Sequence, residues 1–194
     1  MRQPVQKKFK QAISLATPGR ALEIGAHSSE KSAISILQRR KFDYVNLDIS
    51  PSDVPQTVIG DICAKTADET GLEAGSFDFI CATDVFEHLK TPWIAARNVV
   101  DLLKPGGVAF ISTVWSWRYH PVPIDYWRFS HECLQYLFED LECIEADFDD
   151  TQRRKDIRGF WPDGRDHVEV DELGGWRENW SVFFIGKKSA VQLK

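Results

Sequence analysis

The chain has 194 residues, 43% of them hydrophobic and 27% charged, and it carries a formal net charge of −5. This composition is ordinary for a soluble globular protein, and the length favours a single domain with a large core. The acidic balance argues against general nucleic-acid binding, which normally needs a basic face. We find neither an apolar run of about 20 residues, as a membrane span requires, nor a signal peptide, and therefore expect a cytoplasmic protein. The cysteines form no Cys-x-x-Cys pair and are expected to be reduced packing residues.

Strands and helices are predicted to alternate along the chain. The first half carries a helix at 6–16, a strand at 21–25, a helix at 29–40, strands at 43–49 and 57–61, and a polar, helical segment before Gly75. The second half carries a strand at 77–83, a helix at 91–103, a strand at 108–113, a helix at 130–139, and strands at 141–148 and 181–186. This order predicts an α/β fold with a doubly wound, mostly parallel sheet of seven strands and an antiparallel last strand.

Three acidic residues follow neighbouring strands at the edge where open α/β sheets bind ligands. Glu23 lies near the end of the first strand, Asp48 ends the second, and Asp61 follows the third. An acid in the position of Asp48 can accept hydrogen bonds from both hydroxyls of a ribose. Gly25 comes two residues after Glu23, and a backbone without a side chain lets a ligand approach a helix N-terminus. The pattern predicts a nucleotide-type site, with Asp61 on the adenine side.

Several segments around these acids resemble the motifs of class I S-adenosylmethionine-dependent methyltransferases. They are Leu22-Glu-Ile-Gly25, Asn46-Leu-Asp-Ile-Ser50, Gly60-Asp-Ile62, the stretch at 77–89, and Leu102-Leu-Lys-Pro-Gly-Gly-Val108. The resemblance implies a Rossmann-like sheet and methyl transfer from S-adenosylmethionine. It also implies cofactor contacts at Glu23, Gly25, Ala26, His27, Asp48, Ile49, Asp61, Ile62 and Thr83.

The resemblance also implies a division of the chain, which we expect to form one methyltransferase domain over residues 1–194. We expect an N-terminal helix within 1–18, a cofactor-binding core at 20–113, an aromatic loop on the acceptor side at 114–130, and an insertion at 149–180. The tryptophans of the insertion, Trp161, Trp176 and Trp180, could cover the same cleft as the aromatic loop.

One departure from the family concerns the turn after the first strand. The family usually places two further glycines where this chain has His27 and Ser29. A non-catalytic relative that binds S-adenosylmethionine therefore remains an alternative. An adenine-dinucleotide oxidoreductase is a second alternative, although the chain lacks Gly-x-Gly-x-x-Gly at this turn.

The segment Asp84-Val-Phe-Glu-His88 follows the fourth predicted strand, on the side where a methyl acceptor would lie. Asp84 and His88 would share a face if this segment were helical. A structural role, a general-base role for His88, and a divalent cation held by Asp84, Glu87 and His88 all remain open. We list Asp84 and His88 as catalytic candidates and expect no metal.

The stretch at 115–129 contains more aromatic residues than a core can absorb from a loop. Aromatic faces with interspersed charges suit a sugar ring or a flat molecule. We therefore predict acceptor contacts at Trp115, Tyr119, Asp125 and Trp127, with His120 as a further catalytic candidate. The alternative is a rigid loop packed by its own aromatic residues. The expected partner is a small-molecule or glycan-type acceptor methylated at oxygen; the pattern predicts no oligomeric state.

Overall fold

The computed structural model describes residues 3–116, 119–121, 123–148 and 181–190. Its strands are β1 (Arg20–Ile24), β2 (Asp43–Asp48), β3 (Thr57–Ile59), β4 (Phe77–Thr83), β5 (Leu103–Val114), β6 (Glu142–Phe148) and β7 (Ser181–Lys187). Its helices are α1 (Gln3–Leu15), α2 (Ile34–Arg39), α3 (Pro92–Leu102) and α4 (His131–Leu137), with short 3₁₀ helices η1 (Asp68–Thr70) and η2 (Phe86–His88). The insertion expected at 149–180, including Trp161, Trp176 and Trp180, lies outside the described residues.

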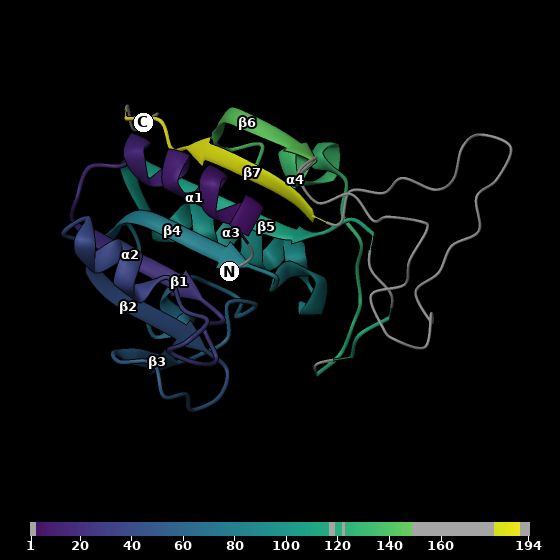
Figure 1. Ribbon diagram of the computed structural model, residues 1–194, viewed down its shortest axis with the longest axis horizontal. Coiled ribbons are helices and arrows are strands. Elements are labelled where there is room, and N and C mark those ends of the chain that lie inside the picture. Colours follow the sequence, from purple (N-terminus) through teal and green to yellow (C-terminus); the bar gives the residue numbers. More distant parts are fainter. Residues whose placement is uncertain (1–2, 117–118, 122, 149–180, 191–194) are drawn as a thin grey trace, which may run out of the picture.

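The seven strands form one sheet in the order β3-β2-β1-β4-β5-β7-β6 (Figure 1). β7 runs antiparallel to both of its neighbours, β5 and β6, while the other pairs are parallel. The predicted doubly wound sheet with an antiparallel last strand is therefore confirmed. The parallel strands β1, β2 and β4 end at one edge, so the residues that follow them lie near one another.

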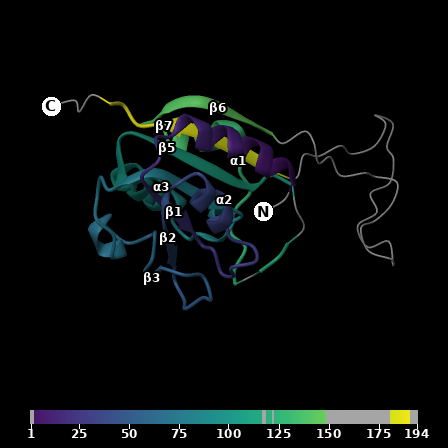
Figure 2. The same cartoon turned by 60° about the vertical axis from the view of Figure 1, so that its left-hand side comes forward.

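Helices cover both faces of the sheet. On one face, α1 and α2 lie over the sheet (Figure 2). They bury Phe9 and Leu37, and the Phe9 ring meets Phe79 and Phe110 edge-on. On the other face, α3 and α4 pack against the same sheet, and the ring of Phe138, the C-cap residue of α4, lies stacked on the Phe184 ring of β7 at 5.2 Å. Two apolar layers thus hold the strand ends in fixed positions.

Two predicted helices are shorter than expected. The helix expected at 29–40 begins only at Ile34, because the Ser32 hydroxyl and the Ala33 N–H donate to Glu23 and hold the preceding residues in a turn. The prediction of a helical segment before Gly75 is wrong apart from η1. There the Asn98 amide of α3 donates to two carbonyl oxygens, of Ile62 and Ala64, at 2.8 Å each, and a helix would need those oxygens itself.

Other local predictions are confirmed by the structure. β4 has the bounds expected of it, and α3 begins at Pro92. The Ser130 hydroxyl caps α4 by accepting from the Cys133 N–H at 3.2 Å. β5 is longer than predicted: it includes Gly106, whose N–H donates to Lys188 of the C-terminal segment at 3.0 Å.

The cysteines form no disulfide. Cys81 is buried as expected, but Cys143 is exposed, so the packing role predicted for it is wrong. None of the helices in the described part of the chain combines the length and apolar character of a membrane span.

Candidate functional site

The turn after β1 is organised by the buried carboxylate of Glu23. Both Glu23 oxygens accept the Ala33 N–H, at 3.0 and 2.9 Å, and Oε2 also accepts the Ser32 and Tyr44 hydroxyls at 2.7 and 2.6 Å. Burial and the adjacent Glu23 raise the pKa of Tyr44 well above its ordinary value, so the phenol remains a donor. Glu23 therefore fixes the loop that leads into α2.

Gly25 has a backbone conformation and surroundings that exclude a side chain. Its φ is +75°, a left-handed value that residues with a Cβ rarely adopt. A Cβ placed there would lie 2.7 Å from Cγ2 of Val85, in the turn after β4. The turns after β1 and β4 are thus in direct contact at this glycine.

A buried amide holds the next residue of the same turn. Asn46 accepts the Ala26 N–H at 3.2 Å and donates to the Ala26 carbonyl at 3.1 Å. Ser29 is tied to Asp53, whose carboxylate accepts the Ser29 N–H at 2.9 Å. His27 is exposed between these two anchors. The Ser29 hydroxyl also donates to the Asp53 carbonyl at 2.8 Å, and a glycine at this position would lack that hydrogen bond.

The end of β2 presents an acid beside an exposed apolar side chain. Asp48 is 8% exposed, and its Oδ1 accepts both the N–H and the hydroxyl of Ser50, at 2.9 and 3.1 Å. Within the described residues, no contact engages Oδ2. Ile49 is 66% exposed. The edge of the sheet thus offers an unengaged carboxylate oxygen next to an uncovered aliphatic surface.

The segment after β3 continues this edge. Asp61 is exposed and accepts the Cys63 N–H through Oδ1 at 2.8 Å, while Ile62 is buried. Thr83, at the end of β4, is half-buried and pairs with Ser112 of β5. All the predicted cofactor residues therefore lie at the ends of β1, β2 and β4 or in the segments that follow β1, β2 and β3.

The turn after β4 differs from the helix considered for it. Asp84 has a φ of +55°, and its N–H donates to the Ser112 carbonyl at 2.8 Å. Only Phe86–His88 is helical, as the single 3₁₀ turn η2. Asp84 and His88 consequently do not share a helical face, because the left-handed residue redirects the chain between them.

Glu87 is the most deeply buried ionisable group at this edge, and it comes from η2. Its Oε2 accepts the Thr113 hydroxyl of β5 at 2.6 Å, whereas Oε1 is buried and has no hydrogen-bond donor in the described part of the chain. Burial raises the pKa of Glu87, and the negative charge of Asp84 raises it further. A buried carboxylate oxygen without a donor costs free energy of folding and calls for an explanation.

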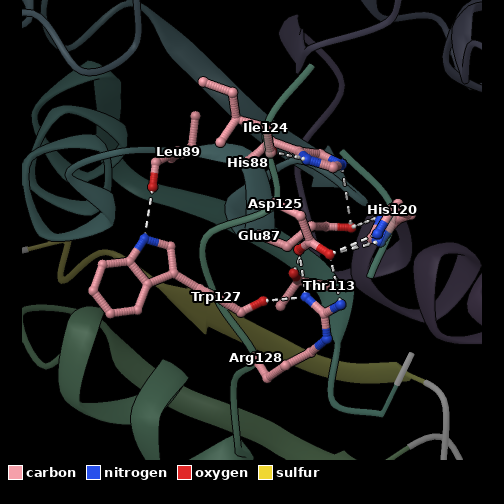
Figure 3. A network of polar contacts seen from close by, with 9 residues as sticks. All are labelled: Glu87, His88, Leu89, Thr113, His120, Ile124, Asp125, Trp127 and Arg128. Carbon is pink, nitrogen blue, oxygen red and sulfur yellow. Dashed lines mark hydrogen bonds and ion pairs between the residues drawn. The ribbon is translucent and has the colours of Figure 1, made fainter. Parts of the chain in front are cut away.

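Two imidazoles face that oxygen (Figure 3). Nε2 of His88 and Nε2 of His120 each lie 3.9 Å from Glu87 Oε1, and their ring centroids are 4.9 Å apart. Nδ1 of His88 donates to the Ile124 carbonyl at 2.6 Å. Nδ1 of His120 lies 3.2 Å from Asp125 Oδ2. The structure thus brings together His88 and His120, the two predicted catalytic histidines.

Asp125 lies beside this pair, and its side chain is buried (Figure 3). Its side chain is 2% exposed, and its carboxylate accepts from the Arg128 guanidinium, at 2.7 Å from Nη2 to Oδ2, and from the His120 N–H at 2.9 Å. The hydrogen bonds from Arg128 hold the pKa of Asp125 well below its usual range. Asp125 is thus a charged anchor for the loop that carries His120.

The aromatic residues of this loop are partly exposed. Tyr119 is 72% exposed, whereas Trp115 lies against the Phe148 ring at 5.3 Å. Trp127 donates its indole N–H to the Leu89 carbonyl at 2.8 Å (Figure 3). Its ring lies 6.1 Å from Trp93 of α3. Some of these rings therefore pack on neighbours, while parts of them remain uncovered.

Several residues that shape the site were not predicted. Tyr44 and Asn46 alternate with Asp48 along β2, so a strand with polar residues at every second position was the available signal. Thr113 and Arg128 gave no such signal, because their roles depend on contacts with Glu87 and Asp125 that the sequence does not reveal.

Known proteins are similar to this chain in sequence over part of its length. A family model described as a methyltransferase domain matches residues 1–150. An uncharacterized methyltransferase of Mycobacterium sp. (strain KMS) is 24% identical over 110 residues, which is 54% of this chain and 44% of that protein. A ubiquinone biosynthesis O-methyltransferase of Xanthomonas axonopodis pv. citri is 43% identical over 42 residues, 22% of this chain and 18% of that protein. The match spans less than half the length of these relatives.

Solved structures share the fold over almost the whole chain. A SAM-dependent methyltransferase from Archaeoglobus fulgidus has a TM-score of 0.67 at 13% identity, covering 97% of this chain and 95% of that one. The protein bound to the Trm112 methyltransferase activator of Haloferax volcanii has a TM-score of 0.66 at 18% identity, covering 96% and 90%. The cosubstrate of the matched family is S-adenosylmethionine. With residues 1–150 matched by the family model and with this sheet order, the chain belongs to the S-adenosylmethionine-dependent methyltransferases of the class I fold.

Proposed function

We propose that this protein transfers a methyl group to a hydroxyl oxygen of a small-molecule or sugar-like acceptor. The observation that carries the proposal is the contact between Gly25 and Val85, which sets the cofactor-side turn against the segment that bears Glu87 and His88. S-adenosylmethionine, when bound, supplies a methyl group on a positively charged sulfur. The buried carboxylate and imidazoles would then face the acceptor beside that methyl group.

The residues along the edge of the sheet fit S-adenosylmethionine. Asp48 Oδ2 has no partner among the described residues and can accept from ribose hydroxyls, and exposed Ile49 offers an apolar surface to an adenine ring. We assign cofactor contacts to the predicted set: Glu23, Gly25, Ala26, His27, Asp48, Ile49, Asp61, Ile62 and Thr83. Within this set, Glu23 acts by holding the loop, because its oxygens are already engaged.

The acceptor side is formed by the loop after β5. Trp115, Tyr119 and Trp127 keep exposed ring surface, on which a sugar or another flat acceptor can stack. Asp125 is bound to Arg128 and is buried, so we assign it a positioning role in place of direct acceptor contact. These assignments favour a neutral acceptor with hydroxyl groups over a strongly charged one.

A hydroxyl must lose its proton as its oxygen is methylated, and the cluster of Glu87, His88 and His120 is suited to this task. Such a cluster can take the proton on an imidazole or hold a cation that acidifies the hydroxyl. His88 and His120 are therefore our catalytic residues. Asp84 turns the chain with its left-handed backbone, and its charge lies close enough to act on Glu87.

The test is a methylation screen with S-adenosylmethionine and acceptors in matched sets of three, each hydroxyl compound beside its deoxy and its amino analogue. We expect S-adenosylhomocysteine to form with hydroxyl compounds only. We expect the His120→Ala variant to be at least tenfold slower, since general acid–base catalysis contributes about 10²–10⁴-fold to a rate. His131→Ala is the matched control, because His131 lies outside the cluster. Cofactor binding without turnover on any acceptor, or turnover restricted to amines, would contradict the proposal.

A further inference from the structure

The buried oxygen Oε1 of Glu87 lacks a hydrogen-bond donor, although the rest of the side chain is well held. The side chain has 0% exposure, and Thr113 donates to Oε2 at 2.6 Å. Oε1 is buried without a donor among the described residues. Leaving a buried charged acceptor unsatisfied costs more than about 1–3 kcal/mol. A positively charged group that binds between Glu87 and its neighbours would remove this cost.

The atoms that face Oε1 are imidazole nitrogens, which can bind a metal but lie too far from Oε1 to donate a hydrogen bond to it. Nε2 of His88 and Nε2 of His120 each lie 3.9 Å from Oε1, too far for a hydrogen bond. One ligand atom from each of the three residues lies within 4.8 Å of the other two. Ligands bound at about 2.1 Å in a tetrahedral site are about 3.4 Å apart, so a small contraction would bring the three atoms around one cation.

The second nitrogen of each imidazole also lies near an acceptor, through a hydrogen bond in His88 and at ion-pair distance in His120. His88 donates its Nδ1–H to the Ile124 carbonyl at 2.6 Å, which leaves the lone pair of Nε2 facing Glu87. Nδ1 of His120 lies 3.2 Å from the Asp125 carboxylate, which Arg128 holds in place. Metal-binding histidines typically donate their second ring N–H to a backbone carbonyl or a carboxylate, as His88 does, and Asp125 is the carboxylate nearest to His120.

We propose that Oε1 of Glu87, Nε2 of His88 and Nε2 of His120 bind a divalent transition-metal cation. Two imidazoles and one carboxylate favour Mn²⁺, Co²⁺ or Zn²⁺ over Mg²⁺, which prefers oxygen ligands and retains its water. Three protein ligands leave coordination positions for water or for the acceptor. This set differs from the one considered from sequence, because His120 of the aromatic loop takes the place of Asp84.

The cation has two consequences. It ties the loop that carries His120 to η2, so that binding of the metal orders one wall of the acceptor site. Its catalytic use rests on the proposed function: an acceptor hydroxyl bound to the cation has a lowered pKa and releases its proton to water, the O–H electron pair staying on oxygen. Metal binding itself does not depend on that function.

Binding is tested by titrating Mn²⁺ into metal-free protein and following free Mn²⁺ by electron paramagnetic resonance. We expect one site per chain, with affinity lowered at least tenfold in Glu87→Gln and His120→Ala and unchanged in His131→Ala. Because Glu87 is buried, far-UV circular dichroism checks the fold of its variant, and His120→Ala in the half-buried loop provides the independent result. Asp125→Asn should weaken binding by about tenfold through the orientation of His120.

A second readout uses Co²⁺, whose visible spectrum reports nitrogen and oxygen ligands. Absence of a one-to-one site for Mn²⁺, Co²⁺ and Zn²⁺ would overturn the proposal, and so would equal affinity in wild type, Glu87→Gln and His120→Ala. Methyl transfer that continues unchanged after treatment with a chelator would overturn the cation's catalytic use while leaving the proposed function standing. If the protein binds the metal but methylates no acceptor, the metal site stands and the proposed function is contradicted.

Discussion

Replacing Gly25 by alanine tests how the cofactor-side turn is built. The substitution imposes a φ of +75° on a residue with a Cβ, and it brings that Cβ to 2.7 Å from Val85. The left-handed conformation costs about 1–2 kcal/mol. Overpacking costs about a further 1–3 kcal/mol. We expect Gly25→Ala to lose about 2–5 kcal/mol of unfolding free energy and to bind S-adenosylhomocysteine more weakly.

Two further variants separate these contributions. Gly75 has a φ of +62° and open space where its Cβ would lie, so Gly75→Ala should lose only the conformational part, about 1–2 kcal/mol. Val85→Ala removes the atoms that clash. In that background Gly25→Ala should cost about 1–2 kcal/mol, which gives a coupling energy of about 1–3 kcal/mol between the two positions.

The assay is urea unfolding of the four proteins of the cycle, with calorimetry for S-adenosylhomocysteine affinity. If the losses of unfolding free energy in Gly25→Ala and Val85→Ala add up to that of the double variant within about 0.5 kcal/mol, the direct contact between the turns is refuted. Equal losses for Gly25→Ala and Gly75→Ala would refute it as well.

Three other predictions concern the same edge and the core beneath it. Asn46→Ala removes the hydrogen-bond partner of the Ala26 N–H and carbonyl, and urea unfolding should show a loss of about 1–3 kcal/mol of unfolding free energy. A loss below about 0.5 kcal/mol would argue against a stabilising role for these two hydrogen bonds. In native buffer a thiol reagent followed by peptide mapping should modify Cys143 first and leave Cys81 protected until global unfolding, because Cys81 is buried and burial raises its thiol pKa; early labelling of Cys81 would contradict this. With an acceptor found in the screen, Trp127→Ala should raise KM with little change in kcat, and Trp127→Phe should retain most of the affinity; an unchanged KM in both would remove Trp127 from the acceptor site.

Much of the fold could be predicted because single residues have local effects. Pro92 begins a helix, Ser130 caps one, and the apolar run of β4 forms a central strand. The start of α2 could not be predicted, since the Glu23 carboxylate competes for the N–H groups that precede it. Tertiary contacts of this kind override local propensity.

The candidate site divides in the same way. Asp48 and Asp61 were placed correctly at the edge of the sheet because their positions follow from strand ends. The grouping of Glu87 with His120 could not be predicted, since the two lie far apart in sequence and meet only through the path of the loop after β5. The left-handed Asp84 also escaped prediction, because no glycine marks that turn.

The central claim is that the edge of the sheet at Gly25, Asp48 and Asp61 binds S-adenosylmethionine. Isothermal titration calorimetry on the wild type, Asp48→Ala and Asp43→Ala tests it most directly, since Asp43 begins the strand that Asp48 ends. We predict one site in the wild type, equal affinity in Asp43→Ala, and about 10- to 150-fold weaker binding in Asp48→Ala, from the loss of about 1.5–3 kcal/mol of charged hydrogen bonding. Absence of binding to the wild type, or equal affinity in Asp48→Ala, would contradict the claim.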